Sequence, residues 1–119
     1  MHQILYVFLG GGLGSLCRYG IGRLIPYTGS FYYGTFAANV LSSLLLGIIA
    51  GLLMKESIGN HARLFFITGL CGGFSTFSTF SAETLQLIES GNYFAAANYI
   101  FWSIFICILC IFIGMKWVG

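Results

Sequence analysis

The sequence predicts an all-α integral membrane protein that folds as a single domain over residues 1–119 and crosses the bilayer with four transmembrane helices. Apolar residues make up 58% of the chain and charged residues only 7%, whereas about 25% of the residues of a typical soluble domain are charged. Three stretches, 24–54, 64–82 and 90–115, contain no charged side chain. Because a spanning helix needs about 20 largely apolar residues, each of these stretches is long enough to hold one.

The four spans are expected at about 3–23, 33–54, 62–88 and 93–117. The first is not expected to be a cleaved signal peptide, because the N-terminus lacks a basic start. Four spans place both termini on the same side of the membrane, so the chain is a multi-pass protein whose solvent is the lipid bilayer.

Basic residues nearly balance across the membrane. Lys55, Arg63 and Lys116 fall on the side of the termini, and Arg18 and Arg23 on the opposite side. This is a weak positive-inside bias, and we expect the chain to insert in both orientations, although so small a count can also arise by chance. No basic run indicates a nucleic acid partner.

The first span contains Gly10, Gly11, Gly12 and Gly14. Small residues allow helices to approach closely in lipid, so these glycines indicate tight helix packing. Arg18, near the end of the span, either extends to the lipid headgroups or lines an aqueous entry.

The second span carries small and polar residues at every fourth position, which places them on one slowly drifting helix face: Thr35, Asn39, Ser43, Gly47 and Gly51. Asn39 is the most polar of them. A buried amide in lipid either bonds to a partner helix or lines a cavity, and both interpretations stay open.

The third span contains the run GGFSTFSTFS, residues 72–81. A glycine inside a helix costs about 1 kcal/mol relative to alanine, so we expect a break between Gly72 and Thr76 near the middle of the membrane. Backbone groups freed by such a break bind ions in transporters. The alternative is an unbroken helix with a glycine crossing.

Beyond the expected break, the rings of Phe77 and Phe80 have edges of positive electrostatic potential, which attract small anions. The hydroxyl groups at positions 75, 76, 78, 79 and 81 and the Asn39 amide add neutral donors. Such a lining can bind an anion without holding it as tightly as fixed cations would.

The fourth span places Tyr99, Ser103 and Cys107 four residues apart on one face. Cys107 and Cys110 form a Cys-x-x-Cys pair, but no second pair or nearby histidine accompanies it, so we expect inert helix residues rather than a zinc site.

One chain with four short helices is too small to enclose a conduit and shield it from lipid. We therefore expect an antiparallel homodimer of oppositely inserted chains. A symmetry axis near the break would bring two sets of carbonyl groups together, and carbonyl oxygens suit a hard monovalent cation.

Three segments of the sequence, GGGLGSLCRY (10–19), GTFAANV (34–40) and GLCGGFSTFSTFSAE (69–83), resemble the CrcB/Fluc family of fluoride channels. The resemblance extends over nearly the whole chain. It implies a dual-topology antiparallel homodimer with a broken third helix in the plasma (inner) membrane of a prokaryote. Such a channel exports fluoride ion passively from the cytoplasm and relieves fluoride toxicity. It also implies a central structural sodium ion between the subunits.

The resemblance also implies roles for individual residues. The backbone carbonyls of Gly72 and Ser75 match the sodium ligands, and Arg18 matches a basic residue near the vestibule. Cys107 departs from the family, in which a hydroxyl is frequent, and this puts the far end of the polar track in doubt. The fluoride pathway matches aromatic, hydroxyl and amide side chains: Asn39, Phe77, Ser78, Phe80, Ser81, Tyr99 and Ser103.

Two other functions are weighed against this one. A small four-helix dual-topology multidrug-type exporter needs a carboxylate in its first span, and this chain has acids only at Glu56, Glu83 and Glu89. A non-transporting subunit of a membrane assembly would use the polar residues only to hold helices together. An enzyme is not expected, because no nucleophile–base or metal-ligand pattern is present.

Overall fold

A computed structural model describes residues 2–27, 29, 31–56 and 58–118, and these residues form helices and loops without strands. Four helical stretches are long and apolar enough to cross a membrane. The prediction of an all-helical chain with four such helices is confirmed. Their elements are α1 (His2–Leu24), α2 (Tyr33–Met54), the run formed by α3 (Asn60–Arg63), η1 (Leu64–Cys71), α4 (Gly72–Phe74) and α5 (Phe77–Glu89), and α6 (Tyr93–Val118).

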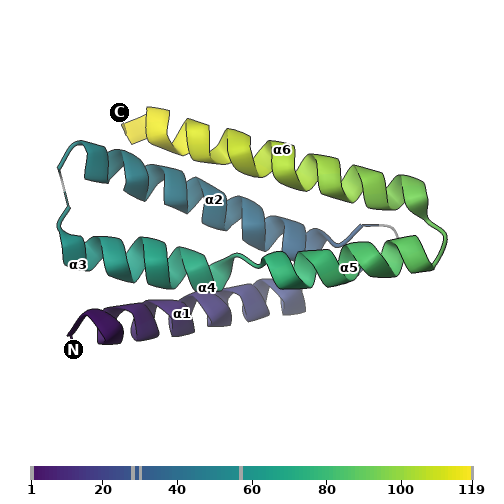
Figure 1. Cartoon of the computed structure of the whole chain (residues 1–119), viewed down its shortest axis with the longest axis horizontal. Coiled ribbons are helices and arrows are strands. Elements are labelled where there is room, and N and C mark those ends of the chain that lie inside the picture. Colours follow the sequence, from purple (N-terminus) through teal and green to yellow (C-terminus); the bar gives the residue numbers. More distant parts are fainter. Residues whose placement is uncertain (1, 28, 30, 57, 119) are drawn as a thin grey trace.

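The chain runs back and forth along one long axis (Figure 1). Both ends of the chain and the connection from α2 to α3 lie at one end of the molecule, and the α1–α2 and α5–α6 connections lie at the other. In the packing, α2 lies against α6, and α1 lies against η1 and α4. The long dimension of 48 Å exceeds the bilayer hydrocarbon core of about 30 Å, so the molecule is long enough to span it.

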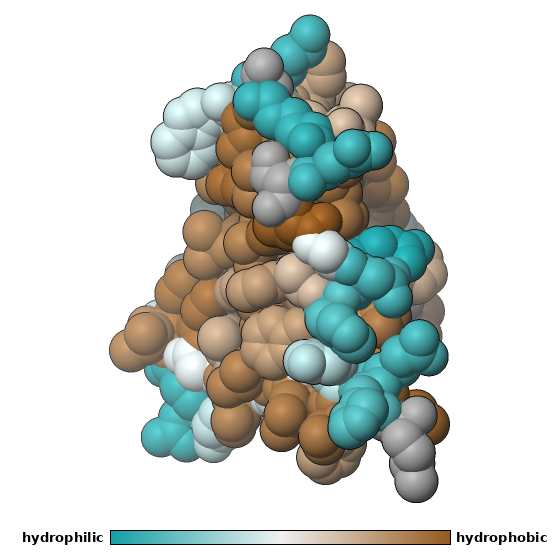
Figure 2. All heavy atoms as spheres, turned by 90° about the vertical axis from the view of Figure 1, so that its left-hand side faces the viewer, coloured by the Kyte–Doolittle hydropathy of each residue, from teal (hydrophilic) through white to brown (hydrophobic). Residues whose placement is uncertain are grey.

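The outer surface is largely apolar. Phe8, Phe94 and Trp117 are each more than 70% exposed. Seen from the end that carries α3, hydrophilic residues gather at the top and along one edge, and hydrophobic residues cover much of the rest (Figure 2). Such a surface is unfavourable in water and suited to lipid.

Glycines bring α1 into backbone contact with the third span. A Cβ atom on Gly14 would collide with the carbonyl oxygen of Leu70, and one on Gly73 would collide with that of Gly11. Gly10 is equally confined, whereas a Cβ on Gly12 would meet no atom within 4 Å. The predicted tight packing is therefore confirmed for Gly10 and Gly14, and it is wrong for Gly12.

A second glycine crossing joins α2 and α6. A Cβ atom on Gly47 would collide with the Ile111 carbonyl, and one on Gly114 would lie 2.7 Å from that of Leu44. The small-residue face of α2 thus divides into two parts. Its C-terminal half packs against α6, and its N-terminal half carries the polar side chains described below.

The third span is interrupted at Ser75 and Thr76, whose backbones are extended (φ −81°, ψ 158° and φ −150°, ψ 121°). Gly72 keeps helical angles (φ −63°, ψ −36°), so the interruption lies at the C-terminal end of the expected range, Gly72 to Thr76, and not at the glycine pair itself. Gly73 instead allows α1 to approach. The helix is therefore interrupted, and a glycine crossing accompanies the interruption at a neighbouring residue instead of replacing it.

Candidate functional site

Asn39 of α2 stabilises the interruption through two hydrogen bonds to its backbone. The Thr76 backbone N–H donates to Asn39 Oδ1 at 2.8 Å, and Asn39 Nδ2 donates to the Thr76 carbonyl at 3.2 Å. Thr76 N–H would donate to the Gly72 carbonyl if the helix continued. Because it bonds to Asn39 instead, the Gly72 carbonyl loses its helical donor.

Thr76 also begins the next helix. Its side-chain oxygen accepts a hydrogen bond from Thr79 N–H at 3.1 Å, the usual N-cap arrangement. A helix can therefore restart at Phe77 directly after two extended residues.

The helix end before the interruption is stabilised by side chains. The Cys71 carbonyl accepts from Ser42 Oγ at 3.1 Å and from Ser75 Oγ at 2.8 Å. Arg18 Nε donates to the Gly73 carbonyl at 3.1 Å, which places a positive charge at a helix C-terminus, where it is favourable.

Arg18 also lines a cavity of about 350 Å³ on the α1 side of the interruption. This position fits the interpretation that Arg18 lines an aqueous entry, and its extension to the headgroups stays a prediction. Arg23, farther along α1, lines the same cavity and bonds to Tyr19 at 3.2 Å. The remaining walls include the hydroxyls of Thr35, Thr76 and Thr79.

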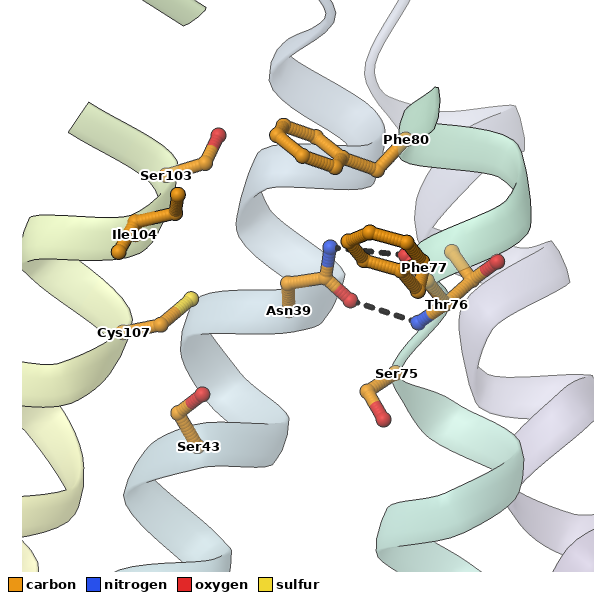
Figure 3. Close-up of a pocket in the computed structure, with 9 residues that line it drawn as sticks. All are labelled: Asn39, Ser43, Ser75, Thr76, Phe77, Phe80, Ser103, Ile104 and Cys107. Carbon is orange, nitrogen blue, oxygen red and sulfur yellow. Dashed lines mark hydrogen bonds between the residues drawn. The ribbon is translucent and has the colours of Figure 1, made fainter. Parts of the chain in front are cut away.

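A second cavity, of about 230 Å³, lies between α2, α5 and α6 (Figure 3). No residue in its lining carries a formal charge. Thr76 lines both cavities, so the interruption separates them. The lining consists of Asn39, Ser43, Ser75, Thr76, Phe77, Phe80, Ser103, Ile104 and Cys107.

Ser103 stands out in this second cavity. It is 5% exposed, and its Oγ is the one buried side-chain nitrogen or oxygen atom without a hydrogen-bond partner in the part of the chain that the structure describes. An unsatisfied buried hydroxyl costs about 1–3 kcal/mol. Ser103 is one of the residues at the cavity wall (Figure 3), and a hydroxyl there could bond to a ligand after a small rotation.

Phe77 and Phe80 line the cavity from α5, with ring centroids 6.0 Å apart at 44°. The two rings differ in how deeply they are buried within the chain. Phe80 is 8% exposed and packs against Tyr99 at 5.0 Å, whereas Phe77 is 79% exposed.

Tyr99 does not line this cavity. It is fully buried, and its hydroxyl donates to Glu83 Oε1 at 2.7 Å, while Thr35 Oγ1 donates to Glu83 Oε2 at 2.9 Å. The sequence placed Glu83 only near a membrane edge and missed this cluster. The signal was available, because Thr35 lies on the polar face of α2 one turn from Asn39.

The structure does not bring Ser78 and Ser81 to the cavity; both are exposed on α5. It does bring Ser43 and Cys107 there. Ser43 was recognised as part of the polar face of α2 but not as a site residue.

An aromatic group closes the end where α1 joins α2. Tyr27 stacks on Tyr32 with centroids 4.3 Å apart, and the Tyr32 hydroxyl donates to Gln86 Oε1 at 2.7 Å. Burial raises the pKa of Tyr32 to about 12. Over the described ranges, no three His, Cys, Asp or Glu side chains converge as a metal site would require.

Comparison with known proteins gives one family. Residues 5–115 match the family model described as CrcB-like protein, Camphor Resistance (CrcB). The chain is 44% identical over 117 residues to the fluoride-specific ion channel FluC of Phocaeicola vulgatus, covering 97% of each chain. It is 41% identical to that of Pyrococcus furiosus (96% and 94% covered) and 40% identical to that of Thermus thermophilus (98% and 94% covered).

The relatives bear the name of an ion channel and not of an enzyme. Their similarity extends over all four apolar helices, which makes this chain a multi-pass protein of a prokaryotic inner membrane. Both the extent of the match and the level of identity lead to one conclusion: the chain belongs to the CrcB family.

Proposed function

We propose that this protein is a fluoride-selective passive channel that exports fluoride from the cytoplasm and so relieves fluoride toxicity. The observation that carries the proposal is Ser103, which lines an uncharged cavity and whose buried hydroxyl has no partner within the described residues. The relatives, which are named fluoride-specific ion channels, supply the identity of the ion.

The chemistry of the cavity fits a small, strongly hydrated anion. Hydroxyl and amide donors replace water around the ion, and the edges of Phe77 and Phe80 add weak positive potential. Binding sites must release an ion as well as bind it, and an uncharged lining satisfies both needs. Arg18 and Arg23 in the neighbouring cavity attract anions to the entrance.

The functional unit in this proposal is an antiparallel homodimer of oppositely inserted chains. Phe77 is 79% exposed in the single chain, and a partner subunit would cover it and close the cavity. Ser78 and Ser81 on the exposed face of α5 would line the pathway only in that dimer, and Tyr99 would reach it through a movement of its hydroxyl away from Glu83.

Two lysines added to the 24–32 loop should bias insertion toward one orientation. The expected result is a lower yield of active dimer, measured as fluoride efflux per milligram of reconstituted protein. Unchanged activity together with a single orientation in a cysteine-accessibility assay would contradict dual insertion.

A structural sodium ion is part of the proposal. Gly72 is exposed, and its carbonyl has lost its helical donor to Asn39; Ser75 is extended, so its carbonyl lies outside the regular helix. These oxygens match the ligands that hard cations prefer. The ion would supply charge that keeps two such backbone segments together near the middle of the membrane.

The multidrug-type exporter is not favoured by any structural feature. Within the described residues, α1 has no acidic side chain to couple protons, and the half-buried carboxylate of Glu83 is held by two hydroxyls. The non-transporting subunit predicts no ion flux from purified protein.

The proposal is tested with purified protein in liposomes loaded with potassium fluoride. Valinomycin shunts the membrane potential, and a fluoride electrode follows release. A passive channel releases fluoride promptly after valinomycin addition and without an added energy source. Release no faster than that from protein-free liposomes would contradict the proposal.

A further inference from the structure

Ser42 of α2 carries a buried hydroxyl that lines neither of the two cavities beside the interruption. It is 2% exposed, and its Oγ donates to the Cys71 carbonyl at 3.1 Å. Asn39, three residues earlier on the same helix, makes two hydrogen bonds to Thr76 (Figure 3). Residues three apart lie on one face of a helix, so a single face of α2 bonds to the chain on both sides of the interruption.

A third bond to this region comes from α1, where Arg18 donates to the Gly73 carbonyl. The two helices therefore bind the backbone before, within and after the short segment 72–75. The helical rise of about 1.5 Å per residue separates the two α2 positions by about 4.5 Å along the helix axis. The spacing between the two flanks of the interruption is thus set by a regular helix.

Two carbonyl groups between these bonds lack their usual donors. In a continuous helix, Gly72 and Ser75 would accept hydrogen bonds from the N–H groups four residues later. The first of these donors bonds to Asn39 instead, and the second bonds to Thr76 Oγ1. A Cβ atom on Gly72 would meet no other helix within 4 Å in the described part of the chain. Both carbonyls are therefore available to a cation.

The neighbouring carbonyl of Cys71 is in the opposite state. It accepts from Ser75 N–H at 3.0 Å, from Ser75 Oγ at 2.8 Å and from Ser42 Oγ at 3.1 Å. A carbonyl oxygen has two lone pairs, so three donors leave none free for a cation. Ser42 thus helps to exclude this oxygen from a cation site and binds the helix end to α2.

We propose that Ser42 is a positioning residue for the structural cation: its bond to the Cys71 carbonyl fixes segment 72–75, so that the carbonyls of Gly72 and Ser75 lie ready to bind the ion. A site whose ligands are ordered before binding loses less entropy when the ion binds. The inference rests on the sodium ion of the proposed function and does not depend on fluoride conduction.

The test is a sodium titration of thermal stability in detergent. Protein purified without sodium is melted at increasing sodium chloride concentrations, while N-methylglucamine chloride keeps the ionic strength constant. An ion that binds only the folded protein raises the melting temperature once its concentration exceeds the dissociation constant. The sodium concentration at which the rise begins therefore reports the affinity of the site.

The wild type is compared with Ser42→Ala, which removes the hydroxyl, and with Ser42→Thr, which keeps it. Thr84→Val is the matched control for loss of a buried hydroxyl. Thr84 is 8% exposed, and its Oγ1 donates to the Phe80 carbonyl at 2.8 Å within α5, away from segment 72–75.

In Ser42→Ala we expect the rise to begin at about tenfold higher sodium than in wild type, as the loss of one hydrogen bond predicts. In Ser42→Thr and Thr84→Val it should begin at the wild-type concentration, even where the melting temperature itself is lower. A constant loss of melting temperature in Ser42→Ala at every sodium concentration would show a packing role only and overturn the inference. Absence of any sodium-dependent rise in wild type would overturn it as well.

Ser75→Ala repeats the test at the same carbonyl if Ser42→Ala does not fold, because it removes the other hydroxyl bonded to Cys71. It should shift the sodium dependence in the same direction, and an unchanged dependence would overturn the inference. Fluoride efflux from liposomes is measured separately on wild type. A sodium dependence that Ser42→Ala shifts, in a protein that releases no fluoride, would support the inference and contradict the proposed channel.

Discussion

The two sides of the interruption in the third span differ in how they pack. Before it, η1 and α4 lie against α1 with backbone touching backbone, through glycines that leave no room for a side chain. After it, α5 presents rings and hydroxyls to two cavities and leaves Phe77 exposed. The first side is packed within one chain, whereas the second leaves the Phe77 ring exposed and the Ser103 hydroxyl without a partner in the described residues.

The largest effect is expected on the glycine side. Gly14→Val places a side chain against the Leu70 carbonyl, and overpacking of this kind costs about 1–3 kcal/mol and at times more. We expect a strongly reduced yield of folded protein and a lower melting temperature in detergent.

Gly12→Val is the matched control for this change. It adds the same side chain to the same helix at a position with nothing within 4 Å. If both variants lose stability equally, helix propensity and not the crossing governs the effect.

The interruption itself should depend on Asn39. Asn39→Leu removes both partners of Thr76, at a cost of about 2–6 kcal/mol for two unsatisfied backbone groups. We expect lower thermal stability and loss of fluoride efflux.

Asn98→Leu provides a comparison, since Asn98 lies on α6 in a different pocket beside Phe31 and Phe94. Its efflux should stay close to that of wild type. Normal efflux from Asn39→Leu would show that the bonds to Thr76 do not position the pathway.

The ring of Phe77 should matter for flux more than for stability. Phe77→Ile keeps an apolar side chain but removes the polarised ring edge, and since the ring is 79% exposed in the single chain, little intrachain packing is lost. We expect efflux to fall at least about tenfold with an unchanged dimer peak in gel filtration.

Phe94→Ile tests the same exchange on α6, where the ring is also 79% exposed but lies away from the cavity. Equal efflux from Phe77→Ile and wild type would remove the argument from ring edges.

The smallest effect on stability is expected at Ser103. Ser103→Ala removes a buried hydroxyl that has no partner in the described residues, so the melting temperature should stay constant or rise slightly, by an amount corresponding to about 1 kcal/mol. Efflux should nevertheless fall, because the pathway loses a donor. A parallel loss of stability and efflux would indicate that the hydroxyl serves packing instead.

Sequence reasoning was strongest where one physical requirement dominates. Four apolar stretches of membrane length predict four helices, and small residues predict the close contact between α1 and the third span. It was weaker at the interruption, because glycine both disrupts helices and permits close approach. Only the position of Gly11 on the neighbouring helix decides that Gly73 does the latter.

The site was predicted only in part, because some of its contacts depend on how the helices pack. Asn39 and Phe80, expected from their amide and ring chemistry, meet Ser103, expected only from the family resemblance, at one cavity. Tyr99 and Glu83 are 16 residues apart in sequence. The hydrogen bond between them depends on how α6 packs against α5, and no local sequence pattern encodes that packing.

The measurement that tests the channel most directly is selectivity in one vesicle population. Liposomes containing the protein are loaded with equal fluoride and chloride, valinomycin is added, and both anions are followed with ion-selective electrodes. The proposed fluoride-selective pathway predicts rapid loss of fluoride while chloride is retained. Release of both anions at the same rate, or of neither, would contradict a fluoride-selective pathway through this cavity.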